Sequence, residues 1–435
     1  MTSLREKRNK AYQAYLDRSR IVRVFRHRDF RFLWTGAFLS FIGSWVQTVA
    51  QGFLVFQLTG RNDLLALVSF LSSVPISVLG PVAGSLADTF DRRKLLVLSQ
   101  IMFAAGAFYL AAATYFGFVT YWQIAIVALL LGIVSAVEQP VRQSTVSSCV
   151  PPEDLPVAIP LNAMTFNISR IIGPVIGGTL YAALGAASCY FVNGLSFFAL
   201  IFAGLAIKAD LSARRREPQP VKDLIMEGAR YTFRDRKLRT LFVLEALVSM
   251  CGLIYITQIP AIAKQMLHMD IRANMTCFLA VGVGAVGALA IITQLADRPV
   301  RALLIRSAMT TLGVALFALS FARTQAFAFP MLALLGMCSI THFNVTNTLF
   351  QTLAPVRLRG RVLSMHMWAL SGLGPFGTLA FGYFAQAAGL PTALRLGGVL
   401  VFLGAIWAWL NIRNLEGVDD RASFYGIADD QEIRT

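Results

Sequence analysis

Four ionisable side chains lie inside long apolar stretches of the sequence, where a charge is costly and therefore suggests a function. Glu138 and Arg142 share one stretch, Arg170 lies midway along the next, and His342 lies in a later one. A charged side chain near the centre of a bilayer costs about 2.5 to 3.5 kcal/mol on insertion scales. A carboxylate opposed by a cation can load and unload a proton as its surroundings change, and histidine titrates near neutral pH. We interpret these four residues as candidates for proton coupling.

Each of the first three residues also has a structural interpretation. Glu138 and Arg142 are four residues apart and could form an ion pair on one helix face, although Pro140 between them distorts that spacing. Arg170 could bind an anionic group of a substrate, hold Glu138 in one conformation, or serve packing alone. The sequence leaves these alternatives open.

The two histidines and Glu245 also have structural interpretations. His342 and His366 could each be a hydrogen-bonded interior histidine rather than a titrating group. Glu245 lies within two turns of the start of its apolar stretch. We therefore expect its side chain to snorkel to the membrane interface.

The elements that must position these residues are membrane-spanning helices. Of the 435 residues, 56% are hydrophobic and only 14% are charged, whereas about a quarter of the residues of soluble domains are charged. A bilayer core of about 30 Å needs about 20 apolar residues per helix. Twelve such stretches are present, at residues 33 to 58, 63 to 87, 94 to 116, 121 to 148, 157 to 183, 187 to 207, 240 to 262, 273 to 296, 302 to 322, 327 to 351, 361 to 386 and 391 to 412.

The distribution of basic residues predicts the topology. Of 39 Lys and Arg residues, ten lie in residues 1–32 and ten in residues 208–239. Most of the others also fall on the side of the membrane that these two segments share. Such an asymmetry follows the positive-inside rule and places both termini in the cytoplasm of a bacterial cell, with the chain in its inner membrane. Short basic loops without interleaved aromatic residues argue against a nucleic-acid partner.

The break in the apolar series divides the chain into two predicted six-helix bundles, residues 33–207 and 240–412. A basic cytoplasmic segment, residues 1–32, precedes them, and a cytoplasmic tail, residues 413–435, follows. In the linker, residues 208–239, apolar residues recur at helical spacing among cations. That pattern predicts an amphipathic helix on the inner membrane surface.

Two motifs of the first half recur in the same order in the second half, which indicates duplication. The segment Gly173-Pro174-Val175-Ile176-Gly177-Gly178 in the fifth stretch is echoed by Gly374-Pro375-Phe376-Gly377 in the eleventh, and Leu86-Ala87-Asp88 recurs as Leu295-Ala296-Asp297. Transporters often contain such repeats, with the substrate site between the halves.

The segment from Gly84 to Lys94 resembles the loop 2–3 signature of the major facilitator superfamily, and the fifth stretch resembles the antiporter signature of that superfamily. The resemblance implies an all-α membrane protein with twelve transmembrane helices in two bundles. It also implies a conformational gate, because Asp88 can meet the positive end of a neighbouring helix and glycine permits close helix packing. The candidate gate residues are Gly84, Asp88, Arg92, Arg93, Gly173 and Pro174.

Further segments, among them residues 26–31, 42–47 and 140–143, resemble the enterobactin-exporter-like group of drug:proton antiporters. That group exports siderophores, macrolides and other amphipathic small molecules. Many of its members carry an aspartate where this chain has Ser44, so the resemblance does not extend to coupling through the first helix.

Polar stripes indicate where a solute path could lie. In this superfamily the first, fourth, seventh and tenth helices line the cavity, and the first and tenth here each carry a polar face. Hydrogen bonding between helices is the alternative reading of these stripes. The candidate cavity residues are Ser44, Gln47, Gln51, Gln258, Asn344 and Thr348.

Together these features predict a secondary-active transporter that exports an amphipathic small molecule in exchange for protons and works as a monomer in the bilayer. An importer or a lipid flippase of the same fold is an alternative, and a membrane receptor or scaffold is an alternative of another class. No enzyme motif, Walker motif or metal-ligand spacing is present in the sequence, so we expect neither catalysis nor a metal or other cofactor.

Overall fold

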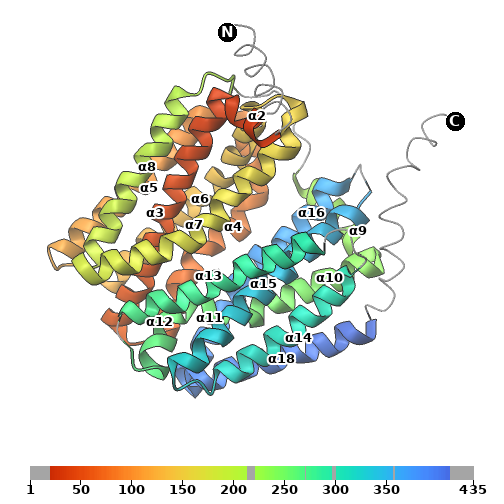
Figure 1. Cartoon of the computed structure of the whole chain (residues 1–435). Coiled ribbons are helices and arrows are strands. Elements are labelled where there is room, and N and C mark those ends of the chain that lie inside the picture. Colours follow the sequence, from red (N-terminus) through yellow and green to blue (C-terminus); the bar gives the residue numbers. More distant parts are fainter. Residues whose placement is uncertain (1–19, 213–220, 270, 296–299, 356–357, 412–435) are drawn as a thin grey trace, which may run out of the picture. The chain divides into compact units, whose positions relative to one another are not determined.

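The computed structural model describes residues 20–212, 221–269, 271–295, 300–355 and 358–411, and all regular elements among them are helical (Figure 1). The side chains at positions 20, 80–89, 167, 221–225 and 271–275 lie outside this description. The prediction of an all-α membrane protein is confirmed.

The helices follow one another with short connections. Their bounds are α2 Arg20–Arg26, α3 Arg28–Thr59, α4 Asn62–Thr89, α5 Arg92–Tyr115, α6 Tyr121–Ser148, η1 Pro152–Asp154, α7 Leu155–Leu184, α8 Ala186–Ala206, α9 Val221–Arg234, α10 Arg236–Leu247, η2 Val248–Gly252, α11 Ile254–Thr257, α12 Ile259–Ala261, η3 Ile262–Met266, α13 Ile271–Gln294, α14 Arg301–Leu319, α15 Gln325–Leu353, α16 Arg359–Met367, η5 Trp368–Gly372, α17 Gly374–Ala388 and α18 Leu390–Asn411.

Within the described residues, eleven helical runs are long and apolar enough to cross a membrane. The predicted span at 361 to 386 is not one of them, and it is built from three consecutive pieces, α16, the π-helix η5 and α17. A π-helix carries an extra residue in its turn and interrupts the regular ladder. This span is therefore a broken helix rather than a continuous one.

The described residues form two compact units. One contains residues of 1–50, 79–119 and 133–217, and the other contains residues of 51–78, 120–132 and 218–435. The second unit therefore includes the first part of α4 and of α6 together with the C-terminal helices. The linker helix α9 belongs to this second unit, where it packs on α16.

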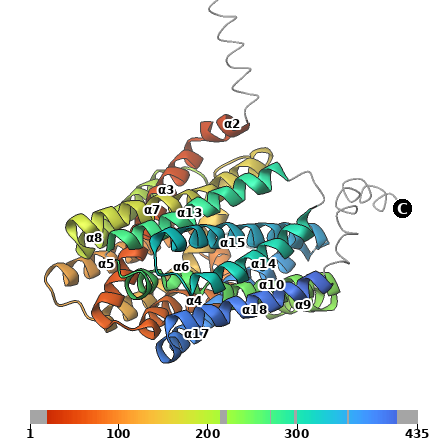
Figure 2. The same ribbon diagram turned by 60° about the horizontal axis from the view of Figure 1, so that its bottom comes forward.

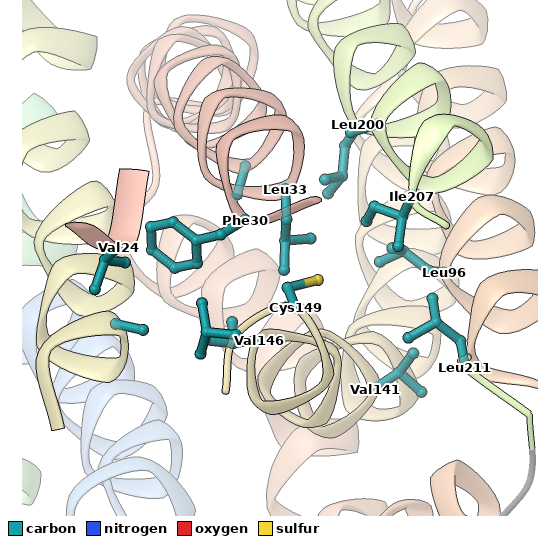
Figure 3. Close-up of a cluster of buried hydrophobic side chains, with 14 residues drawn as sticks. Val24, Phe30, Leu33, Leu96, Val141, Val146, Cys149, Leu200, Ile207 and Leu211 are labelled. Carbon is teal, nitrogen blue, oxygen red and sulfur yellow. The ribbon is translucent and has the colours of Figure 1, made fainter. Parts of the chain in front are cut away.

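The first unit is organised around a buried apolar cluster (Figure 3). It contains Val24 of α2, Phe30 and Leu33 of α3, Leu96 of α5 and Leu200 of α8, all nearly inaccessible. The free thiol of Cys149 lies in the same cluster, as expected for a small apolar packing residue. Dispersion contacts of this kind are individually small but large in sum, and they tie α2 and α3 to α5 and α8.

In the second unit, an amide cluster joins the start of α4 to the C-terminal helices. The backbone N–H of Asn62 donates to Gln386 Oε1 at 3.0 Å, and its side-chain Nδ2 donates to Gln265 Oε1 at 3.4 Å. Gln258 Nε2 donates to the Asn62 carbonyl at 3.1 Å. Further along α4, Ser77 donates to the Ser371 carbonyl at 3.0 Å. Asn62 and Ser77 of α4 are thus held to the C-terminal helices by hydrogen bonds between neutral groups.

Helices α13 and α15 lie side by side in both ribbon views (Figure 2), and glycine permits their close contact. A Cβ built on Gly284 of α13 would overlap the Ala333 carbonyl of α15, and one on Gly336 of α15 would overlap the Val281 carbonyl of α13. The contacts are reciprocal, so the two backbones touch at two points. Small residues at such crossings are typical of membrane helix pairs.

Two glycine turns support the duplication inferred from sequence. Gly185 joins α7 to α8 with φ of 79°, and Gly389 joins α17 to α18 with φ of 88°. Both angles lie in the left-handed region that glycine adopts without strain. The same turn therefore occurs at the same place in each half of the helix series.

The glycine contacts lead to a first prediction. Replacing Gly284 by Ala should lower the thermal unfolding midpoint of the detergent-purified protein, because overpacking a close contact costs about 1 to 3 kcal/mol. Gly287, one helical turn away on α13, has no atom within 4 Å of an added Cβ, so Gly287→Ala is the matched control and should be neutral or slightly stabilising. Equal midpoints for the two variants would contradict the backbone contact.

Candidate functional site

A buried ion pair lies at the centre of the first unit. Arg142 Nε donates to Glu138 Oε1 at 2.8 Å, and the two side chains are 10% and 9% exposed. The guanidinium carbon of Arg142 also lies 4.4 Å from the ring centroid of Phe41 on α3. Pro140, inside α6 between the two charges, does not prevent the i,i+4 contact. The structural alternative considered for this pair is therefore realised here.

An aromatic wall continues from this pair along α3 and α7. The rings of Phe41 and Phe166 pack edge to face at 5.4 Å, and Trp45 lies 5.9 Å from Phe166. The guanidinium of Arg170 lies 5.9 Å from the Trp45 ring. Two guanidiniums therefore flank three aromatic rings, and one of these cations is neutralised by Glu138. We call Phe41, Trp45, Phe166 and the two arginines the aromatic wall.

Such a surface suits an amphipathic ligand. Aromatic faces attract cations and apolar rings, while a guanidinium fork can bind an acidic group. Phe166 is 45% exposed, so part of the wall is open rather than enclosed by protein.

The polar stripe of α3 divides between neighbouring helices and its own backbone. Gln47 Oε1 accepts a bond of 2.7 Å from Asn193 Nδ2 on α8, and Ser40 donates to Gln100 on α5 at 3.5 Å. Ser44 donates to the Ser40 carbonyl at 2.9 Å, and Gln51 is half-buried. Gln47 and Ser40 therefore make the hydrogen bonds between helices that were the alternative to a role in the cavity.

The stripe of α15 is different, because its members are exposed. Asn344 and Thr348 bond to carbonyls of their own helix, at 2.9 Å each, and Gln351 bonds to Asn347. Asn344, Thr348 and Gln351 are all exposed. A polar helix face is unfavourable against lipid. We interpret this face as one that contacts water or solute.

Gln258, the remaining cavity candidate, is fully buried in the second unit. Its side-chain nitrogen is the donor in the bond to the Asn62 carbonyl, whereas its Oε1 has no hydrogen-bond partner. The contact gives Gln258 a role in holding α4.

The gate candidates are only partly described. Arg92 is buried and donates to Ser148 at 3.2 Å, and Arg93 donates to the carbonyls of Ile207 and Ala209 at 2.7 and 3.3 Å. These bonds tie the start of α5 to the ends of α6 and α8. The side-chain environment of Gly84 and Asp88 lies outside the described part of the chain, as do Ala296 and Asp297 of the second copy.

The antiporter-signature positions of α7 pack directly on α3. A Cβ on Gly173 would overlap the Cβ of Trp45, and one on Gly177 would lie 2.9 Å from the Val46 backbone. Pro174 follows within α7. This close crossing places Trp45 opposite α7 and so helps form the aromatic wall.

The expectation that Glu245 snorkels to the membrane interface is wrong. Its side chain is fully buried, with His342 Nε2 at 3.2 Å from one carboxylate oxygen and His366 Nδ1 at 3.8 Å from the other. The expectation used only the distance of Glu245 from the start of its own helix, α10. Packing of α15 and α16 over the same turn, which the sequence of α10 does not reveal, encloses the carboxylate.

Sequence reasoning also missed an ionic contact in the first unit. Asp154 of η1 accepts from Arg23 Nε at 2.7 Å, and its second oxygen lies 2.8 Å from His27 Nε2. The basic residues of the N-terminal segment could have indicated this contact, but they were interpreted only as determinants of membrane topology.

Three comparisons with known proteins agree with this geometry. The helix arrangement resembles that of a bacterial homolog of the human lysosomal transporter Spinster, with a TM-score of 0.67, 14% identity and coverage of 89% of this chain and 97% of that one. The nucleoside transporter NupG gives a TM-score of 0.66 at 14% identity, with coverage of 91% and 99%. The fold is that of polytopic helical transporters.

A family model described as transmembrane secretion effector matches residues 22–427. The chain therefore belongs to that family, within the major facilitator superfamily, as the sequence motifs predicted.

Curated relatives of similar length are efflux and siderophore transporters. The multidrug efflux pump Tap of Mycolicibacterium fortuitum is 28% identical over 86% of this chain and 94% of its own. The staphyloferrin A transporter of Staphylococcus aureus is 25% identical over 85% and 92%. Macrolide efflux protein A of Streptococcus pyogenes is 23% identical over 86% and 93%. The chain is thus a multi-pass membrane transporter related to efflux pumps.

The buried pair in the first unit gives a second prediction. Glu138→Gln leaves the Arg142 cation without its counter-ion, and Arg142→Met leaves the Glu138 anion, so each single variant should lose stability. Breaking a buried pair costs about 3 to 5 kcal/mol, whereas removing both charges is often nearly neutral. The double variant should therefore unfold at a higher temperature than either single variant in detergent. Strictly additive losses would show that the two side chains are not energetically coupled.

Proposed function

We propose that this protein exports an amphipathic small molecule, drug-like or siderophore-like, by alternating access between two six-helix bundles, driven by inward proton flow. In this proposal it works as a monomer in the bacterial cytoplasmic membrane with both termini in the cytoplasm. The efflux pumps among its relatives support the direction of transport.

The observation that carries the proposal is the aromatic wall with its ion pair. Rings of Phe41, Trp45 and Phe166 offer apolar and π surface to a hydrophobic body. Arg142, Arg170 and Glu138 offer charges of both signs to a polar group on the same ligand. A surface with these two components binds molecules that are themselves amphipathic.

Proton binding changes the charge of this surface. With Glu138 ionised, the two arginines and the carboxylate sum to one positive charge. When Glu138 is protonated its ion pair with Arg142 ends, and the sum becomes two. The added positive charge disfavours a cargo that carries a cation, since like charges repel strongly where the dielectric constant is low. The proton and a cationic cargo then exclude each other, which is the requirement for antiport of such a cargo.

The exposed polar face of α15 supports the same mechanism. Asn344 and Thr348 project from a membrane helix without covering protein, and a hydrated path explains why polar side chains are tolerated there. Uncharged amides and hydroxyls along such a path contact many cargos without binding any of them tightly.

A third prediction tests direction and coupling together. Everted membrane vesicles are energised to an acidic interior that is reported by a pH-sensitive dye, and staphyloferrin A and a macrolide are then added separately. An exported cargo should release protons from the wild-type vesicles and should accumulate inside them. Glu138→Gln should abolish proton release, because the amide cannot carry a proton.

Glu153→Gln is the matched control, because Glu153 is an exposed carboxylate of η1, and it should behave as wild type. Cargo accumulation in right-side-out vesicles instead would favour an importer, and movement of a labelled phospholipid would favour a flippase. Binding without flux would favour a receptor.

A fourth prediction concerns the aromatic wall. Trp45→Ala should raise the cargo concentration that gives half-maximal export about twofold to thirtyfold, as expected for losing a cation–π contact of about 0.5 to 2 kcal/mol, with the maximal rate retained. Trp122→Ala, at a tryptophan that is 63% exposed at the start of α6, serves as the control. An unchanged half-maximal concentration in Trp45→Ala would remove the wall from the binding site.

A further inference from the structure

Three ionisable side chains meet in the second unit, and none of them belongs to the aromatic wall. Glu245 comes from α10, His342 from α15 and His366 from α16, and their side chains are 0%, 0% and 1% exposed. Each histidine faces a different oxygen of the one carboxylate, His342 at 3.2 Å and His366 at 3.8 Å. We call these three residues the Glu–His cluster.

The cluster is close but not hydrogen-bonded. Both carboxylate oxygens of Glu245, both ring nitrogens of His342 and Nδ1 of His366 are buried without a hydrogen-bond partner. Buried polar atoms in native proteins are nearly always paired, and an unpaired one needs an explanation. Here the unpaired atoms face one another at 3.2 and 3.8 Å, so the buried cluster has polar groups whose hydrogen-bonding capacity is unused.

The net charge of the three side chains indicates how many protons the cluster binds. With the carboxylate ionised and both imidazoles neutral, the cluster carries one buried negative charge, which costs several kcal/mol to desolvate. One added proton on either imidazole or on the carboxylate makes the set neutral. A second proton makes it positive and restores the cost. The enclosed cluster is therefore most stable with one proton, which belongs to the set rather than to one residue.

On the three helices that carry the cluster, the nearest other charged side chains are five or more residues away, and each has a partner of its own. On α16 the nearest charged residue to His366 is Arg361, which is paired with Glu227 of α9. On α10 the nearest to Glu245 is Arg239, which donates to the Phe233 carbonyl at 3.3 Å. Apart from His342, the titratable group of α15 is the buried thiol of Cys338. The ring of Phe350 packs 5.3 Å from His366.

The two helices that contribute Glu245 and His366 are both irregular beside the cluster. The π-helix η2 begins three residues after Glu245, and η5 begins two residues after His366. Ser249 of η2 donates to the Leu370 carbonyl of η5, so the two irregular turns are joined. π-Bulges are frequent at functional sites, where they allow a helix to change register locally.

We propose that Glu245, His342 and His366 form a second proton-binding site, which holds one proton while enclosed and exchanges it with water when the π-helical turns rearrange, so that its occupancy is coupled to export. The proton comes from water on the side to which the cluster opens and returns to water on the other side, and no other bond is made or broken. The coupling rests on the proposed function, whereas proton binding itself does not.

The binding step is tested without any cargo. The full chain is labelled with ¹⁵N at its four histidines, placed in nanodiscs of phosphatidylethanolamine and phosphatidylglycerol, and titrated from pH 5 to 9 by NMR. His342→Asn and His366→Asn assign the buried signals, which are separate from those of His27 and His268. We expect at least one buried histidine to titrate in this range. Two buried histidines that keep one protonation state throughout would overturn the proposal.

Glu245→Gln keeps the shape of the side chain and removes its charge. The midpoint of the buried histidine titration should move to lower pH by at least one unit, because the carboxylate no longer favours the imidazolium. Glu153→Gln should leave the midpoint in place. An unchanged midpoint in Glu245→Gln would also overturn the proposal. If Glu245→Gln does not fold, Glu245→Met provides the same comparison, because it also removes the carboxylate and keeps a side chain of similar size.

The coupling step is tested in the everted vesicles with whichever cargo wild type exports. Glu245→Gln and the double variant His342→Asn/His366→Asn should reduce pH-driven export at least tenfold while cargo exchange without a proton gradient continues. Undiminished pH-driven export in both would overturn the coupling. Failure of the proposed function looks different, because wild type would then release no protons with any cargo while the histidine titration remained.

Discussion

A buried ionised side chain must find its neutralising partner within the protein, and much of this structure follows from that requirement. Glu138 meets Arg142 one turn away on the same helix. Asp154 draws two basic side chains of the N-terminal segment, Arg23 and His27, to the start of α7. Among the residues that the structure describes, Glu245 is paired with two histidines, His342 and His366. The first two sites are therefore neutral or positive without a proton, whereas the third is not.

The contrast assigns different chemistry to the two groups of buried charges. At Glu138 a fixed cation competes with the proton, so protonation depends on separating Arg142 from the carboxylate. At Glu245 the proton is itself the neutralising partner, since imidazole has no charge until it binds one. In the proposed mechanism, the Glu138–Arg142 ion pair depends on movement of its helices, whereas the Glu–His cluster depends on the supply of protons. In this mechanism, the positions of the helices govern one site and the supply of protons governs the other.

Much of the fold could be predicted from the sequence because membrane helices obey local rules. Length, apolar composition and cation placement identify spans such as Arg92–Tyr115 without reference to other parts of the chain. Motifs near Gly173 correctly indicated a tight helix crossing, and its partner turned out to be Trp45. The broken helix at 361 to 386 was not foreseen, because a π-helical turn leaves no mark in hydropathy.

The site was harder to predict because it depends on contacts between distant residues. Glu138 and Arg142 were paired from spacing alone, since four residues make one helical turn. No spacing rule connects Glu245 with His342 or His366, which come from three different helices. His342 was singled out for its type, and its partner became visible only when α10, α15 and α16 were seen packed together.

The reciprocal glycine contacts between α13 and α15 have a consequence for how the Glu–His cluster can change. Backbones that touch at Gly284 and Gly336 leave little freedom to slide, so α15 carries His342 on a stiff support. The helices of Glu245 and His366 each run into a π-turn instead. Losing the extra residue of such a turn rotates one side of the helix against the other by about 100°, because an α-helix has 3.6 residues per turn. Such a change in either π-turn would turn the carboxylate or the His366 imidazole relative to His342, whose helix has the least freedom to move.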